Sequence, residues 1–419
     1  MKLEHKNISE NNFEQCTKCT ICTLYCPMVE VNPLYPGPKQ SGPDGERYRL
    51  KEPMYYDEGL NYCLNCKRCE ISCPSGVRIG DIIALAKVRN RKGLPTVRDM
   101  LLSSTVNVGS VATRMSGLVN RSLESERFRR GLESMVGIDH RHTLPRYAEE
   151  SFEEWFRREA AEKQSCYSRR VSYFHGCYAN YNDPALGREL VEVLNAVGYG
   201  VRLLEGERCC GMVKIANGRK ERAVRDAKRN LVAIRRAVAE GDKVVATSSS
   251  CTFALRDEYQ YLLGLDNEDV KDSITLITRF LFRQWERGNI KFAFREDFRM
   301  RVAYHSACHI ERLGWAIYST SLLRLVPGLE LEMLPSRCCG MAGTYGFKRE
   351  NYDYSQAIGR PLFDLIEASG AEVVATDCES CKWNIERSTS KRVMHPLSIL
   401  AAALDMERTR ELNGVMDKY

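Results

Sequence analysis

Two runs of cysteine near the N-terminus have the residue type and spacing to hold an inorganic cofactor. CTKCTICTLYCP and CLNCKRCEISCP share the pattern C-x2-C-x2-C-x3-C-P, with cysteines at Cys16, Cys19, Cys22 and Cys26, and at Cys63, Cys66, Cys69 and Cys73. In this pattern three thiolates of a run bind one iron-sulfur cube and the fourth binds the other. We therefore expect two [4Fe-4S] cubane clusters, one on Cys16, Cys19, Cys22 and Cys73 and one on Cys63, Cys66, Cys69 and Cys26.

Zinc or unliganded buried cysteines are the alternatives for these runs. A zinc site normally uses two C-x2-C pairs, whereas each run here is an intact four-cysteine unit closed by proline. The repetition favours the two cubanes, and two such clusters close together would conduct single electrons.

Farther along the chain, cysteines occur as adjacent pairs, Cys209 with Cys210 and Cys338 with Cys339, each followed by glycine. Neighbouring Cα atoms lie about 3.8 Å apart, less than the roughly 4.4 to 6.8 Å of a relaxed disulfide. The N-terminus MKLEHKNISE lacks the apolar run of a signal peptide. We expect a cytoplasmic location, where thiols stay reduced, so the 18 cysteines indicate metal or redox sites.

An internal repeat must position these pairs. VSYFHGCY corresponds to VAYHSACH and KVVATSSSC to EVVATDCESC, at an offset of about 130 residues, so one unit occurs twice. Strands are expected at 171–176, 201–205 and 243–249 and at 302–307, 329–334 and 372–377, with helices at 184–197, 219–239, 315–326 and 352–369. This alternation predicts parallel strands joined by crossover helices.

Each cysteine of the repeats follows the end of one of these strands. Because parallel strands deliver their C-terminal ends to one edge of a sheet, we expect the cysteines of each repeat to converge there. In the second repeat five thiolates would meet, more than a cubane or a zinc ion takes: Cys308, Cys338, Cys339, Cys378 and Cys381. They predict an unusual cluster, which Gly340 would let the backbone approach closely.

The first repeat has a smaller set of cysteines, because Ser248 stands where the second repeat has Cys378. The remaining candidates for metal ligands are Cys177, Cys209, Cys210 and Cys251. Four thiolates could hold a zinc ion or a four-ligand cluster, and serine is a poor substitute for a thiolate on a soft metal. A cluster, zinc and an empty structural site all remain open here.

Other polar residues are expected to play lesser parts. His175, His305 and His309 lie near the cysteines, and we interpret them as packed residues or hydrogen-bond donors rather than ligands. Cys166 belongs to no motif. The glycines of GMAGTYG do not match a dinucleotide fingerprint, so we expect no flavin or NAD on this chain.

The composition, 43% hydrophobic and 28% charged residues over 419 positions, is that of a soluble protein of several domains. The net charge of +7 is spread among acidic residues without an aromatic-plus-basic motif, so no nucleic acid is expected, whereas an anionic membrane surface is a candidate partner. No stretch is long and apolar enough to span a membrane. Residues 99–123 are amphipathic and would contact either the membrane and a quinone or the protein core.

We therefore expect an α+β chain of several domains. Residues 1–95 form an α-helical ferredoxin-type domain with two [4Fe-4S] clusters, and residues 96–165 form a helical linker. Residues 166–295 and 296–405 are two α/β cysteine-rich repeats with small parallel sheets, and residues 406–419 are a C-terminal tail.

Long strings of this sequence also resemble a known family. The two CCG motifs, the closing CESC and segments such as NPLYPGPKQSGPDGERYRLK and CCGMAGTYGFKRENY are similar to the cysteine-rich CCG-domain iron-sulfur subunits. That family includes heterodisulfide reductase subunits and the iron-sulfur subunits of glycolate and lactate oxidases. The chain resembles in particular the C subunits of anaerobic glycerol-3-phosphate dehydrogenases.

The resemblance implies a non-catalytic electron-transfer subunit. Flavin-containing glycerol-3-phosphate dehydrogenase subunits would supply electrons, menaquinone would accept them, and the chain would hold the complex at the cytoplasmic face of the inner membrane as a peripheral protein. It also implies a noncubane [4Fe-4S] cluster on Cys308, Cys338, Cys339, Cys378 and Cys381. Two other hypotheses remain: a catalyst that cleaves disulfides at this cluster, and a zinc-held scaffold that only binds partners.

Overall fold

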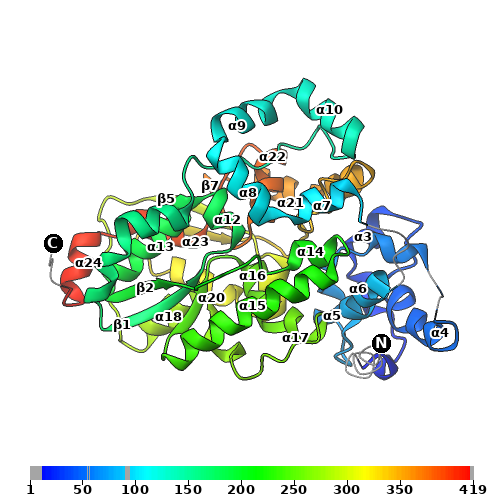
Figure 1. The fold of residues 1–419 in the computed structure, drawn as a ribbon, viewed down its shortest axis with the longest axis horizontal. Helices are drawn as coiled ribbons and strands as arrows, with labels where there is room; N and C mark the ends of the chain where they lie inside the picture. The colour runs from blue at the N-terminus through cyan, green and yellow to red at the C-terminus, as the bar shows by residue number, and fades with distance from the viewer. Residues whose placement is uncertain (1–11, 54, 56, 90–94, 416–419) are drawn as a thin grey trace.

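The computed structural model describes residues 12–53, 55, 57–89 and 95–415. The N-terminal segment MKLEHKNISE and the end of the expected tail lie outside these residues. Figure 1 shows three parts: a small helical part at the N-terminal end, two α/β parts side by side, and a group of helices projecting from them.

The N-terminal part consists of short helices separated by cysteine loops. They are η1 (Phe13–Gln15), α2 (Ile21–Leu24), α3 (Pro27–Val31), η2 (Gln40–Asp44), α4 (Gly45–Lys51), η3 (Glu58–Tyr62), α5 (Arg68–Ile71) and α6 (Ile79–Arg89). Pro27 begins α3, where its missing N–H costs nothing and its fixed φ suits the helix. The core of this part surrounds Leu60, Ile79 and Ile83, each almost fully buried.

The linker is helical, as expected, but residues 99–123 do not form one continuous helix. The linker as a whole contains α7 (Val97–Ser103), α8 (Thr105–Arg114), α9 (Ser116–Glu124), α10 (Glu126–Val136), α11 (Phe152–Trp155), η4 (Phe156–Ala160) and η5 (Glu162–Cys166). A capping box of Thr96 and Asp99 fixes the start of α7. Ser104 and Met115 leave the helical conformation, so the apolar stripe bends around the molecule.

The first repeat contains β1 (Arg169–Phe174), α12 (Gly176–Tyr181), α13 (Pro184–Ala196), β2 (Tyr199–Leu203), α14 (Met212–Ala216), α15 (Lys220–Ala239), β3 (Lys243–Ala246), α16 (Ser249–Phe253), η6 (Ala254–Glu258), α17 (Tyr259–Tyr261), η7 (Lys271–Ser273), β4 (Ile274–Leu276) and α18 (Ile277–Glu286). Its sheet has the order β2-β1-β3-β4 with every pair parallel. The crossover helices pack their apolar faces on β1 and β3, whose central residues are fully buried.

The second repeat contains β5 (Met300–Tyr304), α19 (Cys308–Leu313), α20 (Ala316–Leu323), β6 (Leu329–Met333), η8 (Arg349–Asn351), α21 (Tyr352–Ala368), β7 (Val373–Ala375), α22 (Glu379–Ser388), β8 (Arg392–Met394) and α23 (Pro396–Ala403). Its sheet order, β6-β5-β7-β8, is that of the first repeat and is again all parallel. The expected strands, crossover helices and parallel order are confirmed. Each sheet also has a fourth strand that the sequence analysis did not predict.

The chain beyond the second repeat returns to the first. Residues 406–412 form α24 (Met406–Leu412), which packs near α13 at the end of the molecule opposite the N-terminal part (Figure 1). The hydroxyl of Thr409 accepts a hydrogen bond from the backbone N–H of Ala293 at 3.1 Å. The described helices include none with the length and apolar character that crossing a membrane requires.

Candidate metal centres

The two N-terminal cysteine loops have the same backbone shape. Lys18 and Thr20 in the first loop, and Asn65 and Lys67 in the second, have positive φ between 55° and 64°. This left-handed conformation costs roughly 1 to 2 kcal/mol for each residue that has a side chain. Its occurrence at the same two places in both runs shows that the loops are shaped to turn their cysteines to one side.

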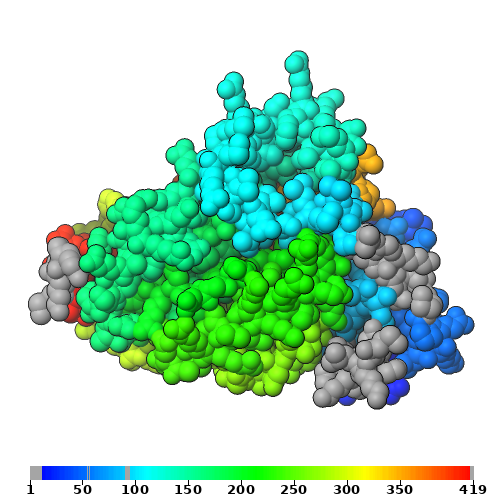
Figure 2. Space-filling model, viewed as in Figure 1, coloured from blue at the N-terminus to red at the C-terminus, as the bar shows by residue number. Residues whose placement is uncertain are grey.

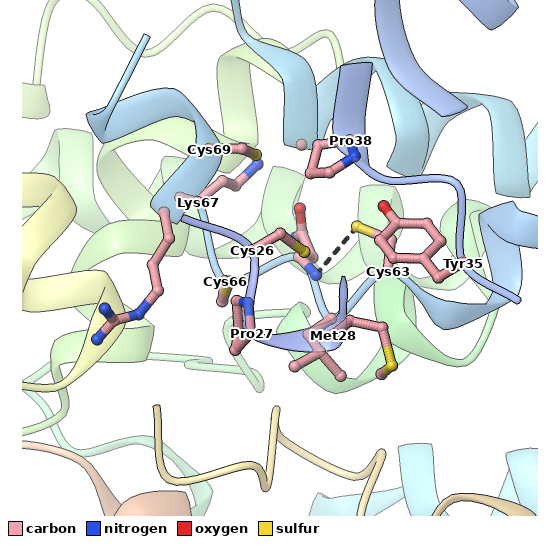
Figure 3. Close-up of a pocket in the computed structure, with 13 residues that line it drawn as sticks. Cys26, Pro27, Met28, Tyr35, Pro38, Cys63, Cys66, Lys67 and Cys69 are labelled. Atoms are coloured by element: carbon pink, nitrogen blue, oxygen red, sulfur yellow. Dashed lines mark hydrogen bonds between the residues drawn. The ribbon is translucent and has the colours of Figure 1, made fainter. Parts of the chain in front are cut away.

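The two loops exchange their fourth cysteines, as the spacing predicts. A single hollow is lined by Cys63, Cys66 and Cys69 of the second run together with Cys26 of the first, and Figure 3 shows their side chains around it. The backbone N–H of Asn65 donates to the Cys63 Sγ at 3.4 Å. Such a donor suits a cluster ligand, because N–H groups stabilise negative charge on sulfur.

The other N-terminal cysteines gather in the complementary set. The pKa of the Cys22 thiol is raised by burial and by the negative charges of Cys16, Cys73 and Cys19. The backbone N–H of Val77 donates to the Cys73 Sγ at 3.4 Å. Cys73 therefore lies with the first run rather than with its own.

The chemistry of these sulfurs fits a metal-bearing group. Burial raises the pKa of both Cys26 and Cys66 to about 12, with a further contribution from neighbouring thiolates. Such sulfurs stay protonated unless a bound cation stabilises the thiolate. Iron supplies that positive charge, so the four-cysteine hollow fits an iron-sulfur cluster.

The second repeat brings its five cysteines to one edge of its sheet. Cys308 begins α19, Cys338 and Cys339 lie in the loop after β6, Cys378 precedes α22 and Cys381 lies within it. Cys381 is hydrogen-bonded to Cys339 and Cys378 through their side chains. The pKa of Cys308 is raised by burial and by the charges of Cys66, Cys338, Cys378 and Cys339. The convergence that the strand order predicts is present.

Cys339 is the member of this set whose thiolate the protein stabilises. A hydrogen bond from Cys381 lowers the pKa of the Cys339 thiol and outweighs burial, assisted by the backbone N–H groups of Met341 and Ala342. Ala342 has a positive φ of 44°, which turns the loop around this sulfur. The loop thus acts as a small anion-binding nest.

Gly340 is required by a contact that the sequence did not suggest. It has φ +82°, and a Cβ on it would lie 2.0 Å from the backbone oxygen of Ser355 in α21. The close approach that forbids a side chain is therefore with a helix of the same repeat. Gly340 allows the Cys338–Cys339 loop to lie directly on α21.

The first repeat places its four cysteines in a chain of contacts. Cys177 of α12 is hydrogen-bonded to Cys209, Cys209 to Cys210, and Cys210 to Cys251 of α16. The pKa of Cys209 is lowered by hydrogen bonds from its two neighbours, whereas that of Cys210 is raised. The predicted set is brought together, without a fifth sulfur.

Ser248 has a structural role that explains why it is not a cysteine. It is the N-cap of α16, where its hydroxyl accepts a hydrogen bond from the backbone N–H of Cys251 at 3.1 Å and donates to Glu379 at 2.9 Å. Cys378 occupies the same position before α22 without a side-chain cap. The serine thus caps a helix and joins the two repeats.

In the described part of the chain, no three His, Cys, Asp or Glu side chains are arranged to hold a single metal ion. A cluster differs from a single ion in that its thiolates bind separate iron atoms.

The three histidines are packed or hydrogen-bonded, as expected. His309 stacks on Phe253 with ring centroids 4.9 Å apart, and the His175 ring is hydrogen-bonded to the oxygen of Gly176 at 2.9 Å. Burial lowers the pKa of His305 to about 3. Cys166 is exposed.

Two charged residues inside the second cysteine run were missed by the sequence analysis. Lys67 is fully buried, and its Nζ forms ion pairs with Asp81, with Glu258 at 3.0 Å and with Glu70 at 3.5 Å. Glu258 comes from the first repeat, so this network joins two parts of the molecule. The signal was present, because Lys-Arg separates Cys66 from Cys69 where the first run has Thr-Ile.

Arg68 joins the same loop to the second repeat. Its Nη2 lies 3.2 Å from the Glu311 carboxylate of α19. Burial disfavours the charge on Arg68, but Cys338, Glu311 and Cys66 outweigh it and its pKa is raised. The hollow of the second cysteine run therefore lies directly beside the cysteine edge of the second repeat.

Comparisons with known proteins agree with this arrangement. Residues 12–77 match the model of the 4Fe-4S dicluster domain, and residues 171–256 and 302–386 match that of the cysteine-rich domain. A glutamate racemase of Bacillus anthracis is similar at a TM-score of only 0.29 and 12% identity, covering 60% of this chain and 84% of that one, too weak a likeness for any conclusion.

Two curated relatives cover nearly the whole chain. The iron-sulfur subunit of Escherichia coli K12 glycolate oxidase is 24% identical over 94% of both chains. The C subunit of anaerobic glycerol-3-phosphate dehydrogenase from Escherichia coli K12 is 52% identical over 398 residues, which cover 95% of this chain and 100% of the relative. The chain therefore belongs to the family of iron-sulfur C subunits of anaerobic glycerol-3-phosphate dehydrogenases.

Proposed function

We propose that this chain carries electrons from flavin-containing glycerol-3-phosphate dehydrogenase subunits to menaquinone at the cytoplasmic face of the inner membrane. Its membership of an iron-sulfur subunit family supports electron transfer, and the 52% identity to the Escherichia coli C subunit supports this upstream enzyme. The chain itself would hold the clusters and the partners without catalysing the oxidation.

The observation that carries this proposal is the contact between the two kinds of cysteine site. Cys66 of the second run influences the pKa of Cys308, and Cys338 influences that of Cys66, so their sulfurs are close. Arg68 lies between them. Iron-sulfur clusters supply reversible one-electron chemistry, and neighbouring buried sites can exchange electrons without any reactant diffusing.

The order of the sites gives the proposed direction. Cys19 is exposed, which makes the set of Cys16, Cys19, Cys22 and Cys73 the entry site for electrons from a partner. The set of Cys26, Cys63, Cys66 and Cys69 follows, and the second repeat receives from it. We assign [4Fe-4S] cubanes to the first two sets.

For the second repeat we propose a noncubane [4Fe-4S] cluster on Cys308, Cys338, Cys339, Cys378 and Cys381. The first repeat keeps Cys177, Cys209, Cys210 and Cys251 as a separate metal site beside the relay. This site lacks a fifth sulfur, and the Ser248 hydroxyl donates a hydrogen bond to Glu379. Both features argue for a metal group other than the noncubane cluster proposed for the second repeat.

The helical linker, residues 96–165, is the proposed membrane and quinone surface. Eight of the twenty large apolar side chains that are exposed among the described residues lie on α7 to α10: Val97, Met100, Leu101, Val111, Met115, Leu118, Phe128 and Met135. Figure 2 shows this segment as a ridge that projects from the molecule. An exposed apolar ridge of this kind is typical of an interaction surface.

The inner side of this ridge reaches both cysteine edges. Thr105, at the start of α8, lies close enough to Cys177 to lower the pKa of its thiol against burial. Leu102 packs against the core that contains Cys339, Cys378 and Cys381. A quinone held under the ridge would therefore lie near the last site of the relay.

Membrane binding is tested with Val111→Asp and Leu118→Asp together, because these side chains are 59% and 62% exposed. Burying two such residues in lipid contributes about 2 to 4 kcal/mol, so the double variant is expected to bind vesicles at least tenfold more weakly. Val232→Asp, 69% exposed on α15, is the matched control and should bind normally. Unchanged sedimentation of the double variant with vesicles would remove the ridge from the proposal.

The function is tested by combining the holoprotein with the flavin-containing subunits under anaerobic conditions. Glycerol 3-phosphate should then reduce a menaquinone analogue only when this chain is present. If the isolated chain with a reduced dye instead cleaves disulfides without any dependence on quinone, the catalyst hypothesis replaces this proposal.

A further inference from the structure

A hollow of about 320 Å³ lies on the first repeat, away from the cysteines. It is bounded by the start of β3, the edge strand β4 and the helix α18. Its lining residues are Lys243, Asp272, Thr275, Arg279, Phe280, Arg283, Gln284 and Arg287. Half of them are cations, and Asp272 is the one carboxylate.

The cations of this hollow are concentrated in a way that costs free energy. Arg279, Arg283 and Arg287 follow one another at intervals of four residues and so lie on one face of α18 and its end. Like charges at this spacing destabilise a helix. The three arginines therefore concentrate positive charge along this face of the helix.

Most of this charge has no counterion. Arg283 pairs with Glu286 at 2.6 Å, but Lys243, Arg279 and Arg287 form no ion pair with any residue the structure describes. The carboxylate of Asp272 lies 3.2 Å from Arg256. The hollow therefore presents a net positive field.

Aromatic rings hold two of these arginines in place. The Arg279 guanidinium lies over Trp315 at 4.4 Å and over Tyr318 at 5.3 Å, and Arg283 lies over Tyr318 at 5.0 Å. Arg283 also donates a hydrogen bond to the Tyr318 hydroxyl at 2.8 Å. Arg279 also donates from its Nη1 to the Thr275 hydroxyl at 3.3 Å, and Arg283 donates from its Nη1 to Glu286, so an anion would bind the remaining N–H groups of the two guanidinium groups.

One donor of this group is buried and unused. The Nε of Arg279 has no hydrogen-bond partner among the described residues, although it is shielded from solvent. Leaving a buried donor unpaired costs free energy.

We propose that this hollow binds a small organic phosphate. Arginine forks match phosphate oxygens in pairs, the volume suits a small molecule, and Phe280 offers an apolar wall for its carbon skeleton. The site is separate from the proposed electron relay, because Lys243 begins the strand at whose other end the cysteines lie.

The placement of the hollow favours a soluble phosphate ester over a lipid headgroup. In Figure 1, α9 and α10 lie at the top of the molecule and α18 near its lower edge. A membrane that contacts the exposed ridge on α9 and α10 would not reach α18. This assignment to a ligand from solution rests on the proposed membrane surface.

Calorimetric titration of the anaerobic holoprotein with glycerol 2-phosphate and with inorganic phosphate tests this site. The ester is expected to bind saturably at one equivalent per chain, more tightly than phosphate and more weakly as salt is raised. The double variant Arg279→Gln with Arg283→Gln should lose at least tenfold in affinity. Arg235→Gln with Arg236→Gln, two exposed arginines of α15, should bind like the parent protein.

A second variant guards against a folding defect. Arg287→Gln changes an exposed side chain and should weaken binding several-fold with the visible absorption unchanged. Absence of saturable binding to the parent protein, or equal affinity of Arg287→Gln and the double variant, overturns the proposal. Vesicles of phosphatidylglycerol should bind these variants and the parent protein alike, and a loss of vesicle binding with the arginines would assign the hollow to lipid instead.

Discussion

Replacing Lys67 with methionine tests the network that joins the second cysteine loop to the first repeat. The lysine is fully buried and faces the carboxylates of Asp81, Glu258 and Glu70. Methionine fills a similar volume but removes the charge. Of the three buried carboxylates, Asp81 would then keep its ion pair with Arg78, and Glu70 would keep its ion pair with the partly exposed Arg312. Removing one partner of a buried ion pair costs about 3 to 5 kcal/mol.

The loss should depend on pH in a defined direction. Burial raises the pKa of Glu258 to about 7 even with Lys67 beside it. A carboxyl whose folded pKa is raised contributes most to stability at low pH, and that contribution is lost as pH rises through the folded pKa. Without the lysine its pKa rises further, so the part of the Lys67→Met deficit that comes from Glu258 should grow as pH rises above about 7. The part that comes from Asp81, whose pKa Lys67 lowers, should already be present near pH 5.

Urea unfolding of the anaerobic holoprotein, followed by visible absorption and tryptophan fluorescence, measures this effect. Lys271→Met is the control, because Lys271 forms an exposed pair with Glu268 that is worth at most about 1 kcal/mol. Adding Glu258→Gln to Lys67→Met should restore part of the stability. If Lys67→Met is as stable at pH 8 as Lys271→Met, the buried network does not hold the parts together.

The remaining predictions concern the repeats. Cys339→Ala should remove one paramagnetic signal and quinone reduction, whereas Cys166→Ala should change neither; a full set of signals in the first variant contradicts the second-repeat site. Gly340→Ala should destabilise the protein by about 2 to 5 kcal/mol, because of the positive φ at this position and the contact with α21. Gly343→Ala is the control, because Gly343 has φ +67° but open space around it. It should cost about 1 to 2 kcal/mol in the same unfolding assay. Ser248→Ala should cost about 1 kcal/mol through the lost helix cap, and an unchanged unfolding midpoint would refute that role.

Much of the fold could be predicted because the signals were local or repeated. The six strands and four helices predicted in the repeats occur within a few residues of their expected positions, since β-branched runs and amphipathic periodicity coincide there. The fourth strands, β4 and β8, are three residues long and carry too little pattern to be seen. Residues 99–123 gave a helical period, but the breaks at Ser104 and Met115 depend on packing against the repeats.

Some features of the cysteine sites could be predicted from the sequence, and others could not. Spacing and strand order predicted which cysteines meet, because thiolates at strand ends converge by topology. Neither signal could predict the Cα position of Gly340 over α21 or the burial of Lys67, since both depend on contacts between distant segments. The motif CKRC shows two charged residues, Lys67 and Arg68, between cysteines. Their role can be inferred only once the positions of their partners in the neighbouring repeats are known.

A redox titration followed by electron paramagnetic resonance, with iron and zinc counts on the anaerobically purified chain, tests the central claim most directly. The proposed relay predicts two cubane signals and a third signal from the second repeat, with about twelve iron atoms per chain, or about sixteen if the first repeat also holds a cluster. The third signal should broaden the cubane signal of the Cys66 site, because the two lie side by side. About eight iron atoms with two isolated signals, or zinc in the second repeat, would contradict the relay.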